Sequence, residues 1–480
     1  MNLLAAAAFL FAPAGQESSA PEKGKRFYVA PDGVPDGDGT NERPWDFETA
    51  LYRAPGIRPG DTVYLRRGTY AEGRWEPSAR RNLEPGRRGT FGENAPILLK
   101  GVVVRSAPGE RAVIDGGFRI GPESAGSVWR DLEVTCSDPR RGAEESDRRP
   151  PRPAGFHVNA ANVKILNNVI HDTLIGVGSW SDAPGTEIYG NVISFTGTSA
   201  PARGHGHGIS FQSRTGPLRL EDNVIFDTFG VGIQGRSESG AGLNDVSLVG
   251  NVVFQNGSLN RESVPSGPLN RAYSYNLWVA PDATSKNLVV EANLTYFAEP
   301  WGRTQIGGES ANGVPRCVGS KLRGNAFMDG AEIFVLNCDK QIASNAFRGA
   351  VSWVDGGGSK DEAAFREAFP LNAFLGRRRP DGLQVIVRRN RYQAKRAHVA
   401  VYNWERAGGV EIDLAKAGFG AGDFFVIRAV QDLAGRQIVG AYEGKPVFVP
   451  MAGWDVAQPA GWDAPASTFP EFGVFLVTTE

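Results

Sequence analysis

Four of the five histidines in this chain lie within one stretch of 51 residues, and they have the clearest potential for acid–base chemistry. Two of them alternate with glycines in the run Arg203-Gly-His-Gly-His-Gly208, which leads into an expected strand carrying Gln212. We therefore expect these two near the mouth of a site on that strand. The four are His157, His171, His205 and His207.

Three kinds of chemistry would use these histidines. In a β-elimination, His207 or His205 would remove the proton next to a uronate carboxylate while Arg236 neutralises that carboxylate. In a metal site, both histidines would be ligands together with Asp182 or His157, although no zinc-binding spacing is present. In a purely structural role, the glycine-flanked histidines would bond backbone groups of a tight turn. His171-Asp172 is interpreted as turn chemistry.

Carboxylates offer a second set of candidates. Hydrolysis of a glycosidic bond needs two carboxyl groups about 5 to 10 Å apart, and the candidates are Asp182, Glu238 and Glu309. No strong cluster of calcium-binding carboxylates is expected on the strands. A glycine-rich loop near the amino terminus contains Asp32, Asp36 and Asp38 and could hold calcium. Their spacing differs from that of an EF-hand loop, however, and favours a turn. No metal site is predicted, and the cofactor requirement stays open.

The residues above are embedded in a repeat. Each copy contains alternating apolar residues, a small or polar residue, Asn, and two apolar residues, and the copies are 20 to 42 residues apart. This pattern predicts a parallel β-helix, with Asn at one corner of every rung in a left-handed backbone conformation and hydrogen-bonded to its neighbours. Asp131 takes the place of Asn in an earlier rung. The repeated asparagines are Asn168, Asn191, Asn223, Asn251, Asn293, Asn325 and Asn345.

The strands that follow each Asn turn can be aligned by their inward residues. Alternation then directs two columns of side chains outward on one sheet. Tryptophan, amide and charged side chains in these columns suit a sugar chain, because aromatic faces stack on sugar rings while polar groups bind hydroxyls. The first column is His157, Gly178, Ser210, Gln234, Trp278 and Gly307, and the second is Asn159, Trp180, Gln212, Arg236, Ala280 and Glu309.

With its segments Gly206-His-Gly-Ile-Ser-Phe-Gln-Ser-Arg-Thr-Gly, Asp222-Asn-Val-Ile-Phe-Asp and Gly250-Asn-Val-Val-Phe-Gln-Asn-Gly, the repeat resembles secreted bacterial right-handed parallel β-helix proteins of the pectate-lyase-like superfamily. The resemblance covers roughly Phe27 to Val354. It implies the fold, but not one activity, because the superfamily contains lyases, hydrolases and epimerases. We expect a polysaccharide lyase acting on a uronate-containing glycan; a glycoside hydrolase and a non-catalytic glycan-binding protein are the alternatives.

Four regions follow from the chain in order. Residues 1–20 are expected to be an export signal, with an apolar run from Leu3 to Ala14 that is too short to span a bilayer. Residues 26–355 are expected to form the β-helix with an amino-terminal cap. Residues 356–382 are expected to be a linker with a short capping helix. Residues 383–480 show short strands separated by turns and are expected to form a small antiparallel β-sandwich.

Composition limits the partners. The 61 glycines and 31 prolines fit a protein of many turns, and a net charge of −1 gives no reason to expect a nucleic acid. We therefore expect a secreted or periplasmic monomer that binds polysaccharide and does not span a membrane.

Cys317 and Cys338 fall at similar places on adjacent rungs and could pair or merely stack, whereas Cys136 has no evident partner.

Overall fold

The structure is a computed structural model. It describes residues 24–53, 55–71, 89–142, 152–199, 205–237, 242–260, 274–281, 283–299, 301–308, 317–336, 341–354 and 358–479. The expected export signal, Glu238, Glu309 and Cys338 lie outside these residues. Within them, no helix combines the length and apolar character needed to cross a bilayer.

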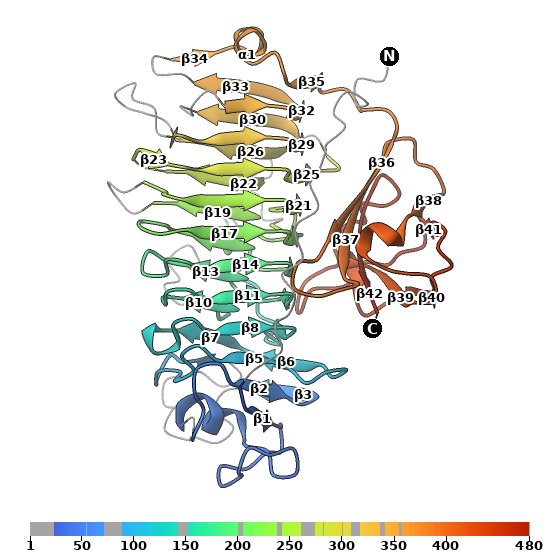
Figure 1. The fold of residues 1–480 in the computed structure, drawn as a ribbon. Helices are drawn as coiled ribbons and strands as arrows, with labels where there is room; N and C mark the ends of the chain where they lie inside the picture. The colour runs from blue at the N-terminus through green and yellow to red at the C-terminus, as the bar shows by residue number, and fades with distance from the viewer. Residues whose placement is uncertain are drawn as a thin grey trace.

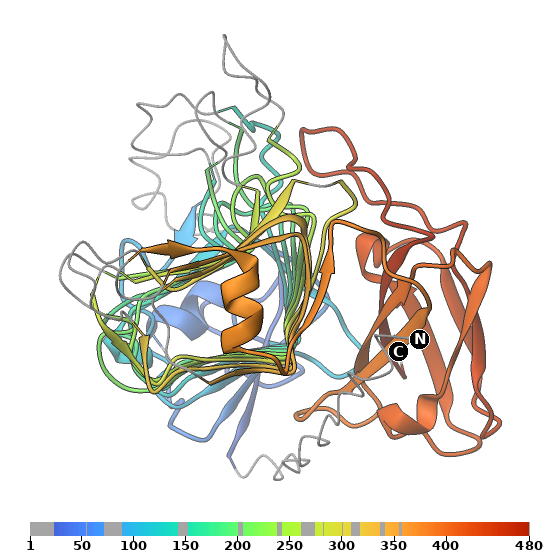
Figure 2. The same ribbon diagram turned by 90° about the horizontal axis from the view of Figure 1, so that it is seen from above.

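The chain folds as a right-handed parallel β-helix with an antiparallel β domain beside it, as the sequence predicted (Figure 1). Three 11-stranded sheets form its sides, and viewed along the axis the rungs superpose (Figure 2). Each full rung passes through sheet A, turns at the Asn corner into sheet B, and reaches sheet C through a second corner. Strand alternation directs one row of apolar side chains from each sheet into a shared core, in which Ile165, Ile170 and Phe156 are fully buried.

The strands of sheet A precede the Asn corner. They are β1 (Arg26–Val29), β2 (Thr62–Leu65), β5 (Val103–Ser106), β8 (Val128–Arg130), β11 (Lys164–Leu166), β14 (Glu187–Tyr189), β17 (Leu218–Glu221), β20 (Val246–Val249), β24 (Val289–Glu291), β28 (Lys321–Arg323) and β31 (Gln341–Ala343). A two-stranded extension, β23 (Ser285–Lys286) and β27 (Cys317–Val318), lies just before β24 and β28 in the chain.

The strands of sheet B follow the Asn corner. They are β3 (Gly68–Ala71), β6 (Ala112–Asp115), β9 (Glu133–Thr135), β12 (Val169–His171), β15 (Val192–Ser194), β18 (Val224–Phe226), β21 (Val252–Phe254), β25 (Leu294–Tyr296), β29 (Ala326–Met328), β32 (Ala346–Arg348) and β35 (Ala373–Gly376).

Sheet C closes each rung and carries the two columns predicted from sequence. Its strands are β4 (Thr90–Phe91), β7 (Gly117–Ile120), β10 (Phe156–Val158), β13 (Val177–Ser179), β16 (Ile209–Phe211), β19 (Ile233–Arg236), β22 (Tyr275–Ala280), β26 (Gly302–Ile306), β30 (Gly330–Leu336), β33 (Ala350–Val354) and β34 (Ser359–Lys360).

The Asn ladder forms as expected, with one correction. Asn223 Oδ1 accepts hydrogen bonds from the backbone N (3.1 Å) and Nδ2 (2.9 Å) of Asn191, and Asn251 Oδ1 does the same for Asn223. The left-handed conformation belongs to the residue before each ladder Asn, such as Asp222 (φ 52°), and not to the Asn itself. Asp131 (φ 55°) occupies this preceding position, so Leu132 stands in the ladder register.

Both ends of the stack are covered. At the amino-terminal end, the π-helix η1 (Thr49–Arg53) buries Ala50 and Leu51 against the first rungs. At the other end, α1 (Glu362–Ala368) buries Phe365 among aromatic side chains, which include Phe347 and Trp353. The expected linker is partly a rung: Asn372 extends the Asn ladder, and β35 pairs with β32. A short 3-10 helix, η3 (Pro122–Ser124), lies between β7 and β8.

The carboxy-terminal domain has one five-stranded antiparallel sheet and one two-stranded sheet, which enclose a separate apolar core. The first sheet contains β36 (Leu383–Arg389), β37 (Ala397–Asn403), β42 (Phe472–Thr478), β39 (Phe424–Ala429) and β40 (Gln437–Ala441). The second contains β38 (Gly409–Ile412) and β41 (Val447–Pro450). Two 3-10 helices, η5 (Leu414–Ala417) and η6 (Val430–Asp432), connect strands.

This domain docks on sheet B (Figure 2). The outward side chains of β18, β21, β25 and β29 are apolar, and Phe254 and Tyr296 pack against Phe472 with ring centroids 5.2 and 4.5 Å apart. Arg388 of β36 pairs with Asp222 at 2.6 Å. Sheet B is therefore covered over these rungs, and sheet C is the side that carries the predicted polar columns.

Candidate functional site

The first predicted column is present on the outward face of sheet C. Strand pairing places His157, Gly178, Ser210, Gln234 and Trp278 side by side on five successive rungs. The second column lies two residues further along each strand and runs from Asn159 to Ala280, with Arg236 opposite Ala280. Both columns therefore follow the register expected from alternation on these five rungs.

The sixth rung differs from the prediction by two residues. Gln305, and not Gly307, stands opposite Trp278. The reason is Thr304, which points inward with no exposed surface and donates a hydrogen bond at 2.7 Å to the buried carboxylate of Asp329. An alignment based on apolar inward residues cannot anticipate a buried threonine whose hydroxyl is satisfied in this way. Glu309, expected in the second column, lies outside the described residues.

One end of the face is an aromatic pair formed by Trp180 and His157. The indole of Trp180 lies against Gly178, where an added Cβ would be 3.1 Å from the ring. Its Nε1 donates to His157 Nδ1 at 3.2 Å, and the ring centroids are 5.3 Å apart. Burial, with a smaller contribution from the charge of Arg119, lowers the pKa of His157 to about 4. At neutral pH His157 is therefore uncharged, with its proton on Nε2, and offers a donor rather than a base.

The other end of the face is a second aromatic pair. Trp278 stacks on Tyr275 with centroids 5.3 Å apart and an interplanar angle of 20°. Arg303 lies over the Tyr275 ring at 6.0 Å and pairs with Glu332 at 3.1 Å. The half-buried indole of Trp278 is thus held in place from the next rungs.

Between the two aromatic pairs the floor is recessed and polar. Ser210 and Gln234 each expose only 6% of their surface although they point outward, and Ser210 Oγ donates to Gln234 Oε1 at 3.4 Å. Three rung spacings separate Gly178 from Trp278, which is about 14 Å. A hydroxyl and an amide therefore lie between two aromatic walls, an arrangement that can bind sugar hydroxyls.

Two exposed arginines lie on the described part of this face, in addition to the ion pair of Arg303 with Glu332. Arg119 stands opposite His157 and is exposed, as is Arg236 at the end of β19. No carboxylate among the described residues forms an ion pair with either guanidinium. Of the three carboxylates proposed for hydrolysis, Asp182 is exposed in the turn after β13, while Glu238 and Glu309 lie outside the described residues. The described residues therefore assemble no carboxylate pair here.

The structure does not bring His207 and Arg236 together. His207 lies at the corner before β16, five residues before Gln212, and this corresponds to about 16 Å along the strand. Its Nδ1 accepts a hydrogen bond from Val231 N at 3.2 Å. His205 lies at the same corner, where its backbone forms two hydrogen bonds with Thr198, at 2.8 and 2.9 Å. The expected pair of base and carboxylate clamp therefore occupies opposite edges of sheet C.

A charged cluster that sequence reasoning treated as turn chemistry lies around His171. His171 Nδ1 is 2.7 Å from Asp172 Oδ2, and its Nε2 is 3.1 Å from Glu133 Oε1. Burial alone lowers the pKa of His171, but these two carboxylates raise it to about 9. Asp172 also pairs with Arg141 and accepts a bond from Ala460 N at 2.9 Å. The cluster fastens the carboxy-terminal domain to the corner between sheets B and C.

The metal sites considered from the sequence can be compared with the structure. Among the described residues, no group of three His, Cys, Asp or Glu side chains is placed to hold a metal ion. Asp38 Oδ1 accepts hydrogen bonds from the backbone N and Oγ1 of Thr40, at 3.0 and 2.7 Å, which is the turn that the loop composition favoured.

Cys136 and Cys317 are buried free thiols. Burial raises the pKa of Cys136, so this thiol is a poor nucleophile.

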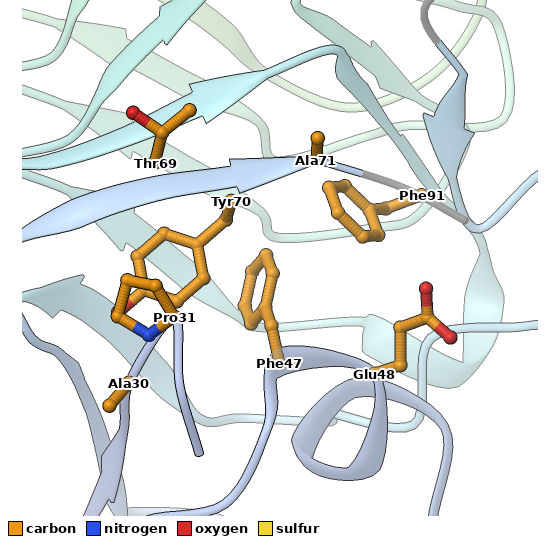
Figure 3. Close-up of a pocket in the computed structure, with 8 residues that line it drawn as sticks. All are labelled: Ala30, Pro31, Phe47, Glu48, Thr69, Tyr70, Ala71 and Phe91. Carbon is orange, nitrogen blue, oxygen red and sulfur yellow. The ribbon is translucent and has the colours of Figure 1, made fainter. Parts of the chain in front are cut away.

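A small hollow lies elsewhere, at the amino-terminal end (Figure 3). Aromatic rings of Phe47, Tyr70 and Phe91 line it, together with Glu48. Tyr70 OH donates to two backbone oxygens, and burial raises the pKa of Tyr70 above its usual range. The hollow is on the first rungs, away from the aromatic pairs of sheet C.

No family model and no curated protein matches this sequence. Solved structures do match. Pectate lyase Pel9A is 15% identical with a TM-score of 0.38, over 69% of this chain and 78% of that one. XylC in complex with xylose is 9% identical with a TM-score of 0.40, over 78% and 89%. The A-module of the Azotobacter vinelandii mannuronan C-5 epimerase AlgE4 is 13% identical with a TM-score of 0.36, over 72% and 97%. At these values the similarities carry no conclusion about activity.

Proposed function

We propose that this protein binds an acidic polysaccharide along the outward face of sheet C and cleaves it by β-elimination. The observation that carries the proposal is the pair of exposed arginines, Arg119 and Arg236, without an ion-pair partner among the described residues. They flank a recessed amide and hydroxyl between two aromatic pairs. Four rung spacings, about 19 Å, separate them along the axis. Such a face suits several sugar rings with carboxylates at intervals.

The chemistry requires a cation and a base. An arginine that binds the uronate carboxylate neutralises it and makes the neighbouring proton more acidic, and a base must then accept that proton. Arg119 lies opposite His157 on the neighbouring rung, and its charge acts on this imidazole. His157 acts as a base only if Nδ1 is released from Trp180 Nε1 when substrate binds.

A second candidate function is binding without cleavage. One observation favours it: His157 Nδ1 and His207 Nδ1 both accept hydrogen bonds, at 3.2 Å each, so neither holds a free lone pair beside an arginine. A face that binds a glycan with fixed donors and aromatic walls needs no base. The two candidates share the same surface and differ only in turnover.

A polysaccharide panel separates these candidates. The full-length protein is incubated with uronate-containing and neutral polysaccharides, while reducing ends and the ultraviolet absorbance of an unsaturated product are followed. Both signals on one acidic substrate would support the lyase. Binding to acidic polysaccharide without either signal would support the second candidate. Reducing ends without absorbance, or no affinity for any acidic polysaccharide, would contradict the proposal.

Removal of either exposed arginine should weaken binding. We expect Arg119→Gln and Arg236→Gln each to lower the affinity for an acidic polysaccharide about ten-fold, because each loses one charge-assisted contact. The loss should shrink as salt is added. The matched control is Arg219→Gln, an exposed arginine on sheet A. Equal affinities of all three variants in a titration would exclude sheet C as the binding face.

A further inference from the structure

Three arginines converge where the last rungs meet the carboxy-terminal domain. Arg348 ends β32 on the outward face of sheet B, Arg379 lies in the connection from β35 to β36, and Arg406 follows β37. Arg379 pairs with Glu471, and Arg406 pairs with the same carboxylate at 3.2 Å. We call these three residues the arginine seam.

The guanidinium of Arg348 is buried without a carboxylate partner. Its residue exposes 9% of its surface, and its Nη1 makes one long hydrogen bond, 3.5 Å, to Met328 O. Its guanidinium carbon lies 5.5 Å from the centre of the Trp404 ring. Nε has no hydrogen-bond partner. Among the described residues, no carboxylate forms an ion pair with Arg348, and a buried charge in this state is destabilising.

The neighbouring acidic side chains do not neutralise the charge of Arg348. Glu471 Oε2 already receives Arg379 and Arg406, and Oε1 accepts from Tyr296 OH at 3.2 Å. Asp329, next to Met328, uses both oxygens for Asn276 and Thr304, at 2.6 and 2.7 Å, and burial raises its pKa. Among the described residues, the seam therefore has three guanidinium groups and one carboxylate that pairs with them, that of Glu471.

We propose that the arginine seam is an anion-binding site that takes a carboxylate or sulfate group, carried by a free ion or by an acidic sugar. An oxyanion can accept hydrogen bonds from the unused N–H groups of Arg348 while it faces Arg379 and Arg406. Guanidinium groups suit this role because their N–H groups can bind two oxygens of one anion. Residues from both the β-helix and the carboxy-terminal domain contribute, so a bound anion links the two. The site lies on the sheet B side and does not depend on the function proposed for sheet C.

Calorimetric titration of the full-length protein tests this proposal, with sodium sulfate in one arm and sodium galacturonate in the other, at constant ionic strength. We expect saturable binding that Arg348→Met weakens at least ten-fold, because methionine keeps the apolar packing on Trp404 and removes the charge. Sulfate binding at least as strong as galacturonate binding identifies a general oxyanion site. Stronger galacturonate binding identifies a site for acidic sugars.

Two controls keep the result specific. Arg366→Met removes an exposed arginine of α1, paired with Glu362 at 2.6 Å, and should leave the affinity unchanged. The Arg119→Gln/Arg236→Gln double variant should also retain seam binding, which separates this site from sheet C. Without added anion, Arg348→Met should be at least as thermally stable as the natural protein. Absence of saturable binding, or equal affinity in Arg348→Met, would overturn the proposal.

Discussion

Replacing Asn223 with alanine is expected to destabilise the protein by about 3 to 5 kcal/mol, because the ladder carries hydrogen bonds that nothing else can replace. Asn223 is fully buried, and its Oδ1 accepts from both the backbone N and Nδ2 of Asn191. Its Nδ2 donates to Ile188 O at 2.8 Å. Alanine would leave the buried Asn191 N–H without this acceptor and the Ile188 carbonyl without this donor, and a small cavity would add to the loss.

The matched control is Asn159→Ala. Asn159 is half-buried on the face of sheet C and is not part of the ladder, so its truncation should change stability by less than about 0.5 kcal/mol. Urea unfolding followed by tryptophan fluorescence compares the two variants with the natural protein. If the midpoints of both variants coincided, the ladder would contribute no more than an ordinary surface amide.

The β-helix could be predicted from sequence because two local signals agree. The alternation of Val and Ile sets strands, and an Asn recurs at one corner, so register and topology follow together. The backbone detail could not be predicted in the same way. Asn tolerates the left-handed conformation, which made the ladder Asn the natural candidate, yet its side chain is needed inside the turn. The preceding residue, for example Asn167 or Gly190, takes the positive φ instead.

The sequence of the sheet B strands indicates that another part of the protein covers this sheet. Strands such as Val224-Ile-Phe226 and Val252-Val-Phe254 are apolar at every position, which indicates burial on both faces. A strand open to water on one side would alternate. Sheet C strands such as Phe156-His-Val158 do alternate, so the same comparison separates the covered side from the side that carries the polar columns.

The candidate site was predictable only in part. Alternation fixes which residues point outward, so the column from His157 to Trp278 could be derived. Alternation does not fix how far a corner residue lies from the far end of the strand. The prediction that His207 and Arg236 act together at one site was therefore wrong. Contacts between side chains could not be predicted from the sequence either. Trp180 lies against Gly178 and donates a hydrogen bond to His157, because the glycine leaves space for the indole ring. The same limit applies to the arginine seam, whose three residues lie at the end of different strands or follow them.

Asp227→Asn is expected to stabilise the protein at alkaline pH and to change it little in acid. Asp227 is fully buried where η6 meets the corner after β18, and its oxygens accept from Gln431 Nε2 at 3.2 Å and Ser258 Oγ at 3.4 Å. Burial raises its pKa to about 7. An asparagine has the same shape, tolerates the left-handed backbone at this position (φ 48°), and carries no charge.

The direction follows from proton linkage. Below about pH 4, Asp227 is protonated in both the folded and the unfolded chain. Between that value and about pH 7 only the unfolded chain releases the proton, so stability falls by about 1.4 kcal/mol per pH unit, at most about 4 kcal/mol in total. Above pH 7 the difference stays constant. The advantage of Asp227→Asn over the natural protein should therefore grow from pH 4 to pH 7 and then level off.

Unfolding midpoints in urea at pH 4.5, 6 and 8 give the difference between variant and natural protein, so contributions from other titrating groups cancel. Asp245→Asn makes the same chemical change at an exposed position with a positive φ of 53°, and it serves as the matched control. A constant difference for Asp227→Asn would mean that this carboxyl ionises normally. A growing one would mean that ionisation of a single carboxyl weakens the contact between the β-helix and the carboxy-terminal domain near neutral pH, because Gln431 belongs to that domain and Asp227 to the helix.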